Sequence, residues 1–300
     1  MQSISLIKAA FNLSDKPVFL FSYFIMNGYD ENDYYKDNNS GSRLSRIFDP
    51  AIAVMDWLTS LYMRKFIKFP AGKVADIGAG VGRLLYYLKK YGYEVYGTSI
   101  SKTACRVSKE RYGIILSYNS DIPEEWPAEE FEAVSYWHVF EHLENPEGHL
   151  KSVSRILKPD GLIFIEIPNP ESVGAGLSKN AWLGSDPAFH INILSYNEVK
   201  KLLHEYGFRI IYKNNFSIKF SFLFIWSGLI GFVAPKSCDF NFIFDLFKRP
   251  MASVKKKPIL TAICYISILV LSPAVFFMLC YGLSRNKGEI IRLVACKLRK

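Results

Sequence analysis

The sequence contains few cysteines, and their spacing argues against the folds that depend on them. Five cysteines are scattered over 300 residues without a CxxC pair. This arrangement argues against a zinc ribbon or a disulfide framework and fits a reducing compartment. The chain also lacks low-complexity stretches, and an aromatic content of 15% excludes a disordered protein. A chain of this length buries a sizeable core without such cross-links.

A secretory signal is also missing. The first apolar stretch is interrupted by Asp15 and Lys16, and no small-residue cleavage pattern follows it. Residues 27–42 are polar and turn-rich and carry Tyr34 and Tyr35. They form either a lid over a cofactor or a solvated loop. We expect residues 1–72 to be a segment of N-terminal helices, one of them from about Pro50 to Phe66, together with this loop.

Surplus positive charge is absent from the first 216 residues, where 24 basic side chains are balanced by 25 acidic ones. Residues 217–300 carry 13 basic and three acidic side chains, so the whole surplus lies beside long apolar runs. Basic residues next to apolar runs indicate an anionic membrane surface as a partner. Because no RNA- or DNA-reading motif accompanies them, nucleic acid is not an expected partner.

From Lys73 onward, short β-rich runs alternate with amphipathic helices. The β-rich runs are VADIG, YEVYG, IILSY, FEAVSYW, GLIFIEI and FRIIYKN. Such alternation is typical of an α/β fold, with a parallel sheet covered by helices on both faces. We therefore expect a doubly wound core over residues 73–216, with LKPDG at 157–161 forming a turn into a strand.

A glycine-rich loop, VADIGAGVGR at 74–83, follows the first of these strands. Glycines here allow a tight turn and close backbone approach to a ligand. A dinucleotide site is not expected, because Arg83 stands where the third glycine belongs and YGTSIS lacks the acid for a ribose. A P-loop is excluded because no GK[ST] follows. Asp76 before the loop suits a ligand with an ammonium group, although a tight turn without a ligand is the alternative.

Further motifs follow this loop in a fixed order. They are YGTSIS, Ser120–Asp121, FEAVSYWHVFEHL, LKPDGLIFIEIPN, and Trp182 with SDPAFHINILSYNEVKKLLHEYGF. In this order and spacing the sequence resembles the class I S-adenosylmethionine-dependent methyltransferases. It is most similar to the branch with ubiquinone-biosynthesis O-methyltransferases and methyltransferases of bacterial surface-glycan clusters. The resemblance covers about residues 73–216 and a closing strand.

This resemblance implies S-adenosyl-L-methionine as the cofactor and assigns its parts to residues after the strands. The residues implied are Asp76, Gly78 and Gly80 for the methionine part, Ser99 for the ribose, Asp121 and Ile122 for the adenine, and Trp137 and His138 for the pocket wall. Most relatives carry an acid where Ser99 stands. GTSIS resembles the variant of cyclopropane-fatty-acid synthases, and a neutral hydroxyl makes weaker hydrogen bonds than a carboxylate.

An oxygen acceptor needs a base, and two histidines are candidates for this catalytic role: His142 in FEHL and His190 in DPAFH. Each has a structural alternative, since His142 can tie a loop to the following helix. His149 and His204 are expected on helix surfaces. No metal site is expected.

The apolar runs lie at 220–235 and 258–284, and the second is long enough to cross a bilayer core of ~30 Å. In the family that the sequence resembles, strand seven returns antiparallel between strands five and six. With GEIIRLVACKL as strand seven, residues 217–287 are an apolar helical insertion between strands six and seven, and 288–300 are the closing strand and basic tail. The fold is then a seven-stranded, mostly parallel sheet whose insertion begins and ends on the same side of a membrane.

We therefore expect a monotopic or hairpin attachment to the cytoplasmic face of the inner membrane. Core helices of a soluble domain and a genuine span are alternatives. The expected activity is O-methylation of a membrane-associated acceptor, such as a lipid-linked sugar, a glycolipid or a quinone precursor. The alternatives are an inactive methyltransferase-like scaffold and a lipid C-methyltransferase.

Overall fold

The computed structural model describes residues 43–69, 71–178, 181–186, 190–217, 220–233, 237–238, 240–248 and 250–299. The chain divides into two compact units, Met1–Arg46 and Ile47–Lys300, and every strand that the structure describes lies in the second. The predicted lid loop with Tyr34 and Tyr35 lies outside the described residues. The predicted domain boundaries stay a prediction.

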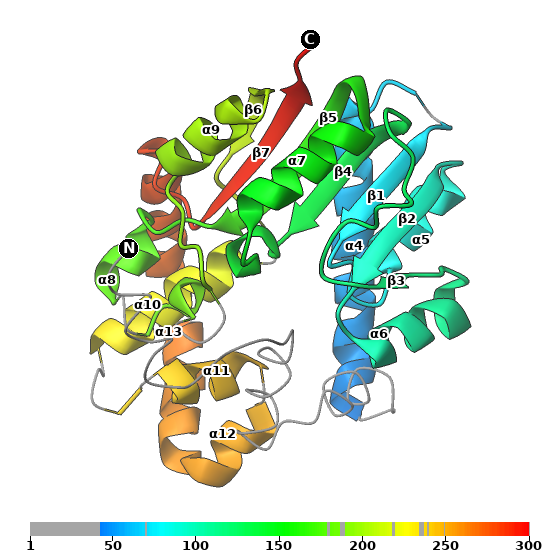
Figure 1. Ribbon diagram of the computed structural model, residues 1–300. Helices are drawn as coiled ribbons and strands as arrows, with labels where there is room; N and C mark the ends of the chain where they lie inside the picture. Colours follow the sequence, from blue (N-terminus) through cyan, green and yellow to red (C-terminus); the bar gives the residue numbers. More distant parts are fainter. Residues whose placement is uncertain are drawn as a thin grey trace, which may run out of the picture. The chain divides into compact units, whose positions relative to one another are not determined.

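A seven-stranded sheet forms the centre of the second unit (Figure 1). Its strands are β1 (Lys73–Ile77), β2 (Glu94–Ser99), β3 (Ser117–Tyr118), β4 (Phe131–Trp137), β5 (Leu157–Pro168), β6 (Phe208–Asn214) and β7 (Ile290–Lys297). The strand order is β3-β2-β1-β4-β5-β7-β6, and only β7 pairs antiparallel with its neighbours β5 and β6. The predicted doubly wound α/β fold with an antiparallel seventh strand is confirmed.

Two strands differ from the prediction. Strand β3 is limited to Ser117–Tyr118, although the apolar run begins at Ile114. Strand β5 begins at Leu157, and the predicted turn is a bulge inside it. Its pairing with β4 jumps from Phe131 opposite Leu157 to Ala133 opposite Leu162. Asp160 in this bulge has a left-handed φ of 63°, which an Asp side chain tolerates better than most.

Helices cover both faces of the sheet and surround its carboxyl edge (Figure 1). They are α4 (Arg43–Phe66), α5 (Arg83–Lys90), α6 (Lys102–Val107), α7 (Pro146–Ile156), α8 (Val173–Leu177), α9 (Tyr196–Glu205), α10 (Ser221–Val233), α11 (Phe240–Lys248), α12 (Pro250–Lys256) and α13 (Pro258–Ser284). The predicted helix near 50–66 is therefore present as part of α4.

The alternation of side chains along the strands divides the interior into two cores. On one face, residues such as Val134 pack with Leu150 of α7 and Leu203 of α9. On the other face, residues such as Ala133 pack with Met63 of α4 and Leu85 of α5. Because neighbouring residues of a strand point to opposite faces, continuous apolar strands supply both cores.

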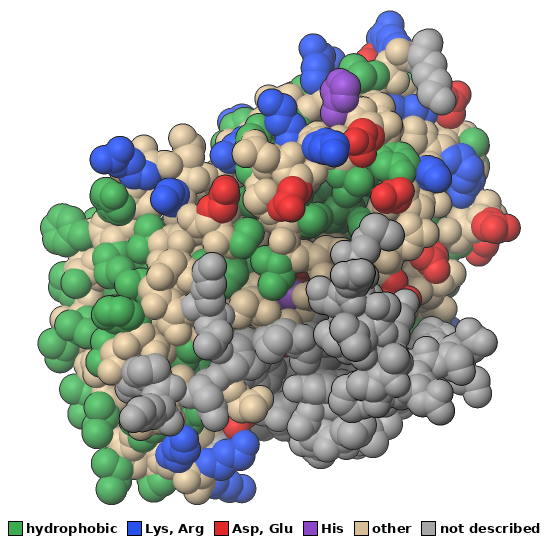
Figure 2. Space-filling view, turned by 60° about the vertical axis from the view of Figure 1, so that its left-hand side comes forward, with side chains coloured by type: hydrophobic (Ala, Val, Ile, Leu, Met, Phe, Trp, Pro, Cys, Tyr) green, Lys and Arg blue, Asp and Glu red, His purple; other side chains and the backbone are tan. Residues whose placement is uncertain are grey.

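Among the described residues, the segment between β6 and β7 forms four helices, α10 to α13. Their apolar side chains pack in a third core together with Ala175 of α8, Trp182 and Ile290 of β7. Among the described residues, one helix, α13, is long and apolar enough to cross a membrane. The helix is packed along one side at Thr261, Cys264, Val275, Leu279 and Gly282, and these positions share a face. The opposite face carries exposed apolar side chains at Ile259, Ile263, Ile266, Val270, Phe277 and Tyr281. In Figure 2 hydrophobic side chains gather over this part of the protein, with Lys and Arg side chains at its lower end.

Two glycines bring the insertion close to α8. A Cβ on Gly228 of α10 would lie 2.2 Å from the carbonyl oxygen of Gly174 in α8, and one on Gly174 would lie 3.0 Å from the Cα of Ile225. Backbone atoms cannot move away as the end of a flexible side chain can. Glycine at both positions therefore sets the distance between α8 and α10.

We predict that Gly228→Ala lowers the free energy of unfolding by about 2 kcal/mol, because the added methyl group overpacks a backbone contact. Gly176→Ala is the matched control, since a Cβ there meets nothing within 4 Å. Thermal and denaturant unfolding of the two variants measure the difference. Equal stability of both variants would contradict this account of the α8–α10 contact.

Candidate functional site

The glycine loop leaves β1 at the carboxyl edge of the sheet, beside the point where the strand order reverses. Gly78, Gly80 and Gly82 have left-handed φ values of 70°, 54° and 73°. The amide of Gly78 donates to Thr98 Oγ1 at 3.3 Å, which ties the loop to β2. A Cβ on Gly80 would meet nothing within 4 Å. The loop is thus a tight backbone cradle with open space at its centre, as a closely approaching ligand requires.

The glycine loop touches the turn that follows β4. A Cβ on Gly78 would lie 2.5 Å from Val139 Cγ2, so only glycine allows this approach. Val139 belongs to the turn that carries His138, Glu141 and His142. The contact therefore brings the predicted cofactor loop and the predicted catalytic segment to one place.

Asp76, the last polar residue before the loop, is buried. Its Oδ1 accepts a hydrogen bond from Ser135 Oγ of β4 at 2.7 Å. Burial raises the pKa of Asp76 to about 7, and the neighbouring charge of Asp56 adds to this effect, while the bond from Ser135 opposes it. A cationic partner next to such a buried carboxyl group stabilises its ionised form.

The residues predicted for the ribose and adenine lie at the ends of β2 and β3. Ser99 is buried, and its hydroxyl accepts from the amide of Ser101 at 3.3 Å. Ile122 is buried in the core, whereas the side chain of Asp121 is 73% exposed.

His149 was expected on a helix surface, and this prediction is wrong. Its residue exposure is only 5%, and its Nε2 lies 3.1 Å from Asp121 Oδ1. The helical periodicity did not reveal this contact, because α7 places His149 on its inner face toward β4.

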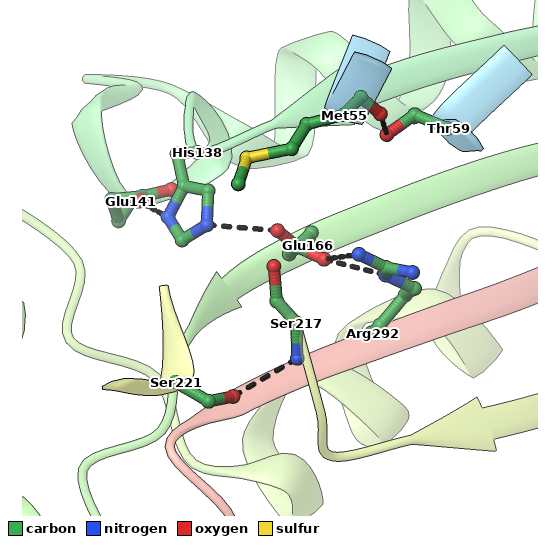
Figure 3. A network of polar contacts seen from close by, with 8 residues as sticks. All are labelled: Met55, Thr59, His138, Glu141, Glu166, Ser217, Ser221 and Arg292. Carbon is green, nitrogen blue, oxygen red and sulfur yellow. Dashed lines mark hydrogen bonds and ion pairs between the residues drawn. The ribbon is translucent and has the colours of Figure 1, made fainter. Parts of the chain in front are cut away.

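Trp137 is the last residue of β4 and His138 follows it, but the two side chains point in different directions. Trp137 packs edge-on against Tyr62 of α4, and its indole nitrogen has no partner among the described residues. His138 lies between two buried carboxylates, with Nε2 3.0 Å from Glu166 and Nδ1 3.3 Å from Glu141 (Figure 3). Its backbone has a left-handed φ of 55°, an uncommon conformation for this residue type.

Arg292 of β7 completes this network by pairing with the other oxygen of Glu166 (Figure 3). Burial alone would lower the pKa of His138, but the two carboxylates outweigh it and raise the pKa. Burial would raise the pKa of Glu166, but His138 and Arg292 lower it on balance. The network thus brings two basic side chains and two carboxylates into mutual contact. Glu166 and Arg292 were not predicted as site residues, because each is a single charged residue in a strand-forming run and their contact depends on β5 pairing with β7.

The insertion reaches this network. The Phe220 ring lies 3.7 Å from the His138 ring between centroids, and Phe224 of α10 lies 5.9 Å away. Aromatic side chains of the apolar segment therefore form one side of the His138 site.

The two candidate catalytic histidines meet next to Glu141. The rings of His142 and His190 lie 4.8 Å apart between centroids. His190 Nδ1 lies 2.8 Å from the carbonyl oxygen of Gly184, which fixes Nδ1 as the donor and leaves Nε2 with a lone pair. Burial lowers the pKa of His190 to about 4, and the nearby Glu141 opposes this shift.

The carboxylate oxygens of Glu141 are buried and accept no well-aligned hydrogen bond among the described residues, but Oε1 forms an ion pair with Nδ1 of His138 at 3.3 Å. Ligand atoms of Glu141, His142 and His190 all lie within 4.8 Å of one another, a set that also suits a divalent cation. The expected absence of a metal stays a prediction.

We predict that Glu166→Gln lowers the free energy of unfolding by about 3 kcal/mol, because Arg292 then loses its buried partner. The pKa of His138 falls in this variant, since one of the carboxylates that stabilise its charged form is gone. Denaturant unfolding and an NMR titration of the histidines measure the two effects. The exposed pair of Lys73 and Glu130 supplies the control Glu130→Gln, with an expected loss below about 1 kcal/mol. An unchanged His138 titration in Glu166→Gln would contradict the pairing.

Comparison with known proteins agrees with this geometry. A family model described as a methyltransferase domain matches residues 53–213, which is more than half of the chain. An uncharacterized protein of Methanocaldococcus jannaschii is 30% identical over 143 residues, which is 47% of this chain and 67% of the relative. A ubiquinone biosynthesis O-methyltransferase of Actinobacillus pleuropneumoniae is 28% identical over 107 residues. That match covers 32% of this chain and 46% of the relative, so the chain spans about half of its length.

Among solved structures, an S-adenosylmethionine-dependent methyltransferase from Archaeoglobus fulgidus superposes with a TM-score of 0.52 at 18% identity. The superposition covers 89% of this chain and 100% of that chain. At this identity the likeness shows the fold. Taken together with the family match, it shows that this chain belongs to the class I S-adenosylmethionine-dependent methyltransferases.

Proposed function

We propose that this methyltransferase O-methylates a membrane-associated acceptor, such as a lipid-linked sugar, a glycolipid or a quinone precursor. The observation that carries the reaction type is the contact between Gly78 and Val139. This contact supports the proposal, because the glycine loop then lies beside the turn that carries Glu141 and His142. One relative acts, by its name, as an O-methyltransferase in ubiquinone biosynthesis, which agrees with a quinone precursor as the acceptor.

The residues at the carboxyl edge fit S-adenosylmethionine, which supplies a methyl group on a sulfonium when bound. Asp76 would pair with the ammonium of the methionine part, and the backbone at Gly78 and Gly80 leaves the space that this part needs. Ser99 would bond the ribose through its remaining hydroxyl hydrogen. Asp121 would accept from the adenine amino group, and Ile122 would flank the ring. Trp137 and His138 would line the wall of this site.

The acceptor hydroxyl must lose a proton, and His190 is suited to take it. With its low pKa, the ring is neutral at pH 7 and its Nε2 is available. His142 lies beside it as a second candidate. Glu141 would stabilise the positive charge that either ring gains, because its carboxylate is buried close to both rings. General bases of this kind contribute about 10²–10⁴-fold to a rate.

Membrane attachment is supported by the way α13 is held. Its first half is tied to α11 by a bond from the Tyr265 hydroxyl to the Leu246 carbonyl oxygen at 2.8 Å. Near its other end, a Cβ on Gly282 would lie 3.1 Å from Val173 Cγ2 of α8. A helix held along one side in this way offers only its opposite face to lipid. This favours a monotopic helix at the cytoplasmic surface of the inner membrane, with Lys255, Lys256 and Lys257 at anionic headgroups.

We predict that S-adenosylmethionine binds and that its affinity falls by up to about tenfold per pH unit below pH 7. The sign follows from the raised pKa of Asp76: below about 7 the carboxyl group is protonated and must lose its proton before it pairs with an ammonium group. Asp76→Asn should bind weakly at every pH, without this slope. Isothermal calorimetry between about pH 5.5 and pH 7.5 measures both proteins. A pH-independent wild-type affinity would contradict the role of Asp76.

Activity is tested by incubating the protein with radiolabelled S-adenosylmethionine and membrane extracts. We expect the radiolabel in the lipid fraction, as a stable methyl ether. In His190→Ala the turnover should fall at least about 10²-fold. Binding without turnover would support the scaffold alternative. Label on a lipid carbon would support C-methylation. Activity that is lost with EDTA and restored by a divalent cation would instead assign Glu141, His142 and His190 to a metal.

We also predict that the double variant Val270→Glu, Phe277→Glu binds anionic vesicles at least about tenfold more weakly. Each substitution puts a charged side chain where an apolar one would contact the lipid. Val270 and Phe277 are 68% and 72% exposed in the protein, so the fold and cofactor binding should be retained. Ile115→Glu is the control, because Ile115 is 79% exposed but precedes β3, outside the insertion. Vesicle flotation measures the effect. Unchanged flotation of the double variant would contradict attachment through this face.

A further inference from the structure

A buried histidine lies directly behind the exposed carboxylate of Asp121. His149 extends from α7, with Nε2 3.1 Å from Asp121 Oδ1 and Nδ1 3.2 Å from the hydroxyl of Tyr136 on β4. Tyr136 is fully buried and His149 is 5% exposed. The three side chains therefore form a chain from the core of the sheet to the surface at the end of β3.

The position of each proton in this chain follows from the partners. A carboxylate only accepts hydrogen bonds, so the imidazole nitrogen that faces Asp121 must carry the hydrogen. In the neutral ring Nδ1 then has the lone pair, and the Tyr136 hydroxyl donates to it. Burial lowers the pKa of His149, and Asp121 offsets this only in part, so the ring is neutral at pH 7. Every polar atom of the buried pair is then satisfied.

Asp121 needs such support because its side chain lies largely in solvent. Its other oxygen, Oδ2, has one weak contact, from the hydroxyl of Ser120 at 3.4 Å. Its backbone amide donates to Asn119 Oδ1 at 3.0 Å, which fixes the main chain but not the carboxylate. An exposed aspartate otherwise samples several rotamers, and the bond from His149 restricts it to one.

We propose that His149 is a positioning residue, which holds the Asp121 carboxylate in the orientation that accepts a hydrogen bond from the 6-amino group of the cofactor's adenine. This inference rests on the proposed cofactor site. Oδ1 is held by His149, and Oδ2 remains for the ligand. Selectivity for adenine then depends on a residue that does not touch the nucleoside, because a preorganised acceptor loses less freedom on binding.

A structural role alone has a different consequence. If His149 only joins α7 to β4, its replacement weakens all nucleosides equally through a general loosening of the site. The useful quantity is therefore the ratio of two affinities. One ligand is S-adenosylhomocysteine, and the other is its analogue with hydrogen in place of the 6-amino group of the purine.

Calorimetry on the full chain measures this ratio. We expect the wild-type protein to prefer the adenine ligand by about tenfold or more, as for a hydrogen bond to a charged group. His149→Leu should reduce the preference at least about threefold. Asp121→Ala should remove the preference, and adding His149→Leu to it should change nothing further. His149→Gln should restore part of the preference, because its amide nitrogen can donate near the position of Nε2.

Two controls separate positioning from damage to the fold. Tyr136→Phe combined with His149→Leu removes both buried polar partners, so it should fold with less loss of stability but show the same reduced preference. His204→Leu on the exposed side of α9 should leave the preference unchanged. A full preference in His149→Leu would overturn the inference and leave the proposed function intact. Failure of the wild-type protein to bind either ligand would overturn the proposed function itself.

Discussion

The antiparallel entry of β7 between β5 and β6 is the constraint on which most of the site depends. Because β7 runs against its neighbours, it begins at the carboxyl edge of the sheet, where β6 ends. The long apolar segment between them must leave and return at that edge. This same entry brings Arg292 to Glu166 and places Glu289 beneath α8, where it accepts from the Gly174 amide at 2.8 Å. The antiparallel position of β7 therefore joins the insertion to the proposed site.

This joining also brings the apolar segment to the proposed site. Phe220 and Phe224 line the His138 network, so the part of the chain that we propose to contact the membrane also lies beside the proposed reaction site. The close glycine contact between α8 and α10 sets the distance between these two helices. With the proposed membrane attachment, a lipid-linked acceptor would reach the histidines along this segment.

Electrostatics at the carboxyl edge follow from burial combined with pairing. Asp76 is buried with one hydroxyl donor, and its pKa rises to about 7. Glu166 is buried to a similar degree, but His138 and Arg292 lower its pKa. The pKa values of these two buried carboxyl groups, on the strands either side of β4, thus shift in opposite directions. The unpaired one suits a cationic ligand, whereas the paired one holds the site together.

The sequence alone determined the alternating α/β pattern, the glycine loop and the apolar helix at 258–284, because these follow from local periodicity and motif spacing. The antiparallel seventh strand was expected from the resemblance to the methyltransferase family. The sequence did not reveal the bulge in β5, the network of Glu166 and Arg292, or the burial of His149. Each of these depends on pairs far apart in the chain, such as β5 with β7 or α7 with the end of β3. These three features are seen only in the folded protein, because the burial and charge of a side chain depend on its neighbours in space, which the order of residues along the chain does not give.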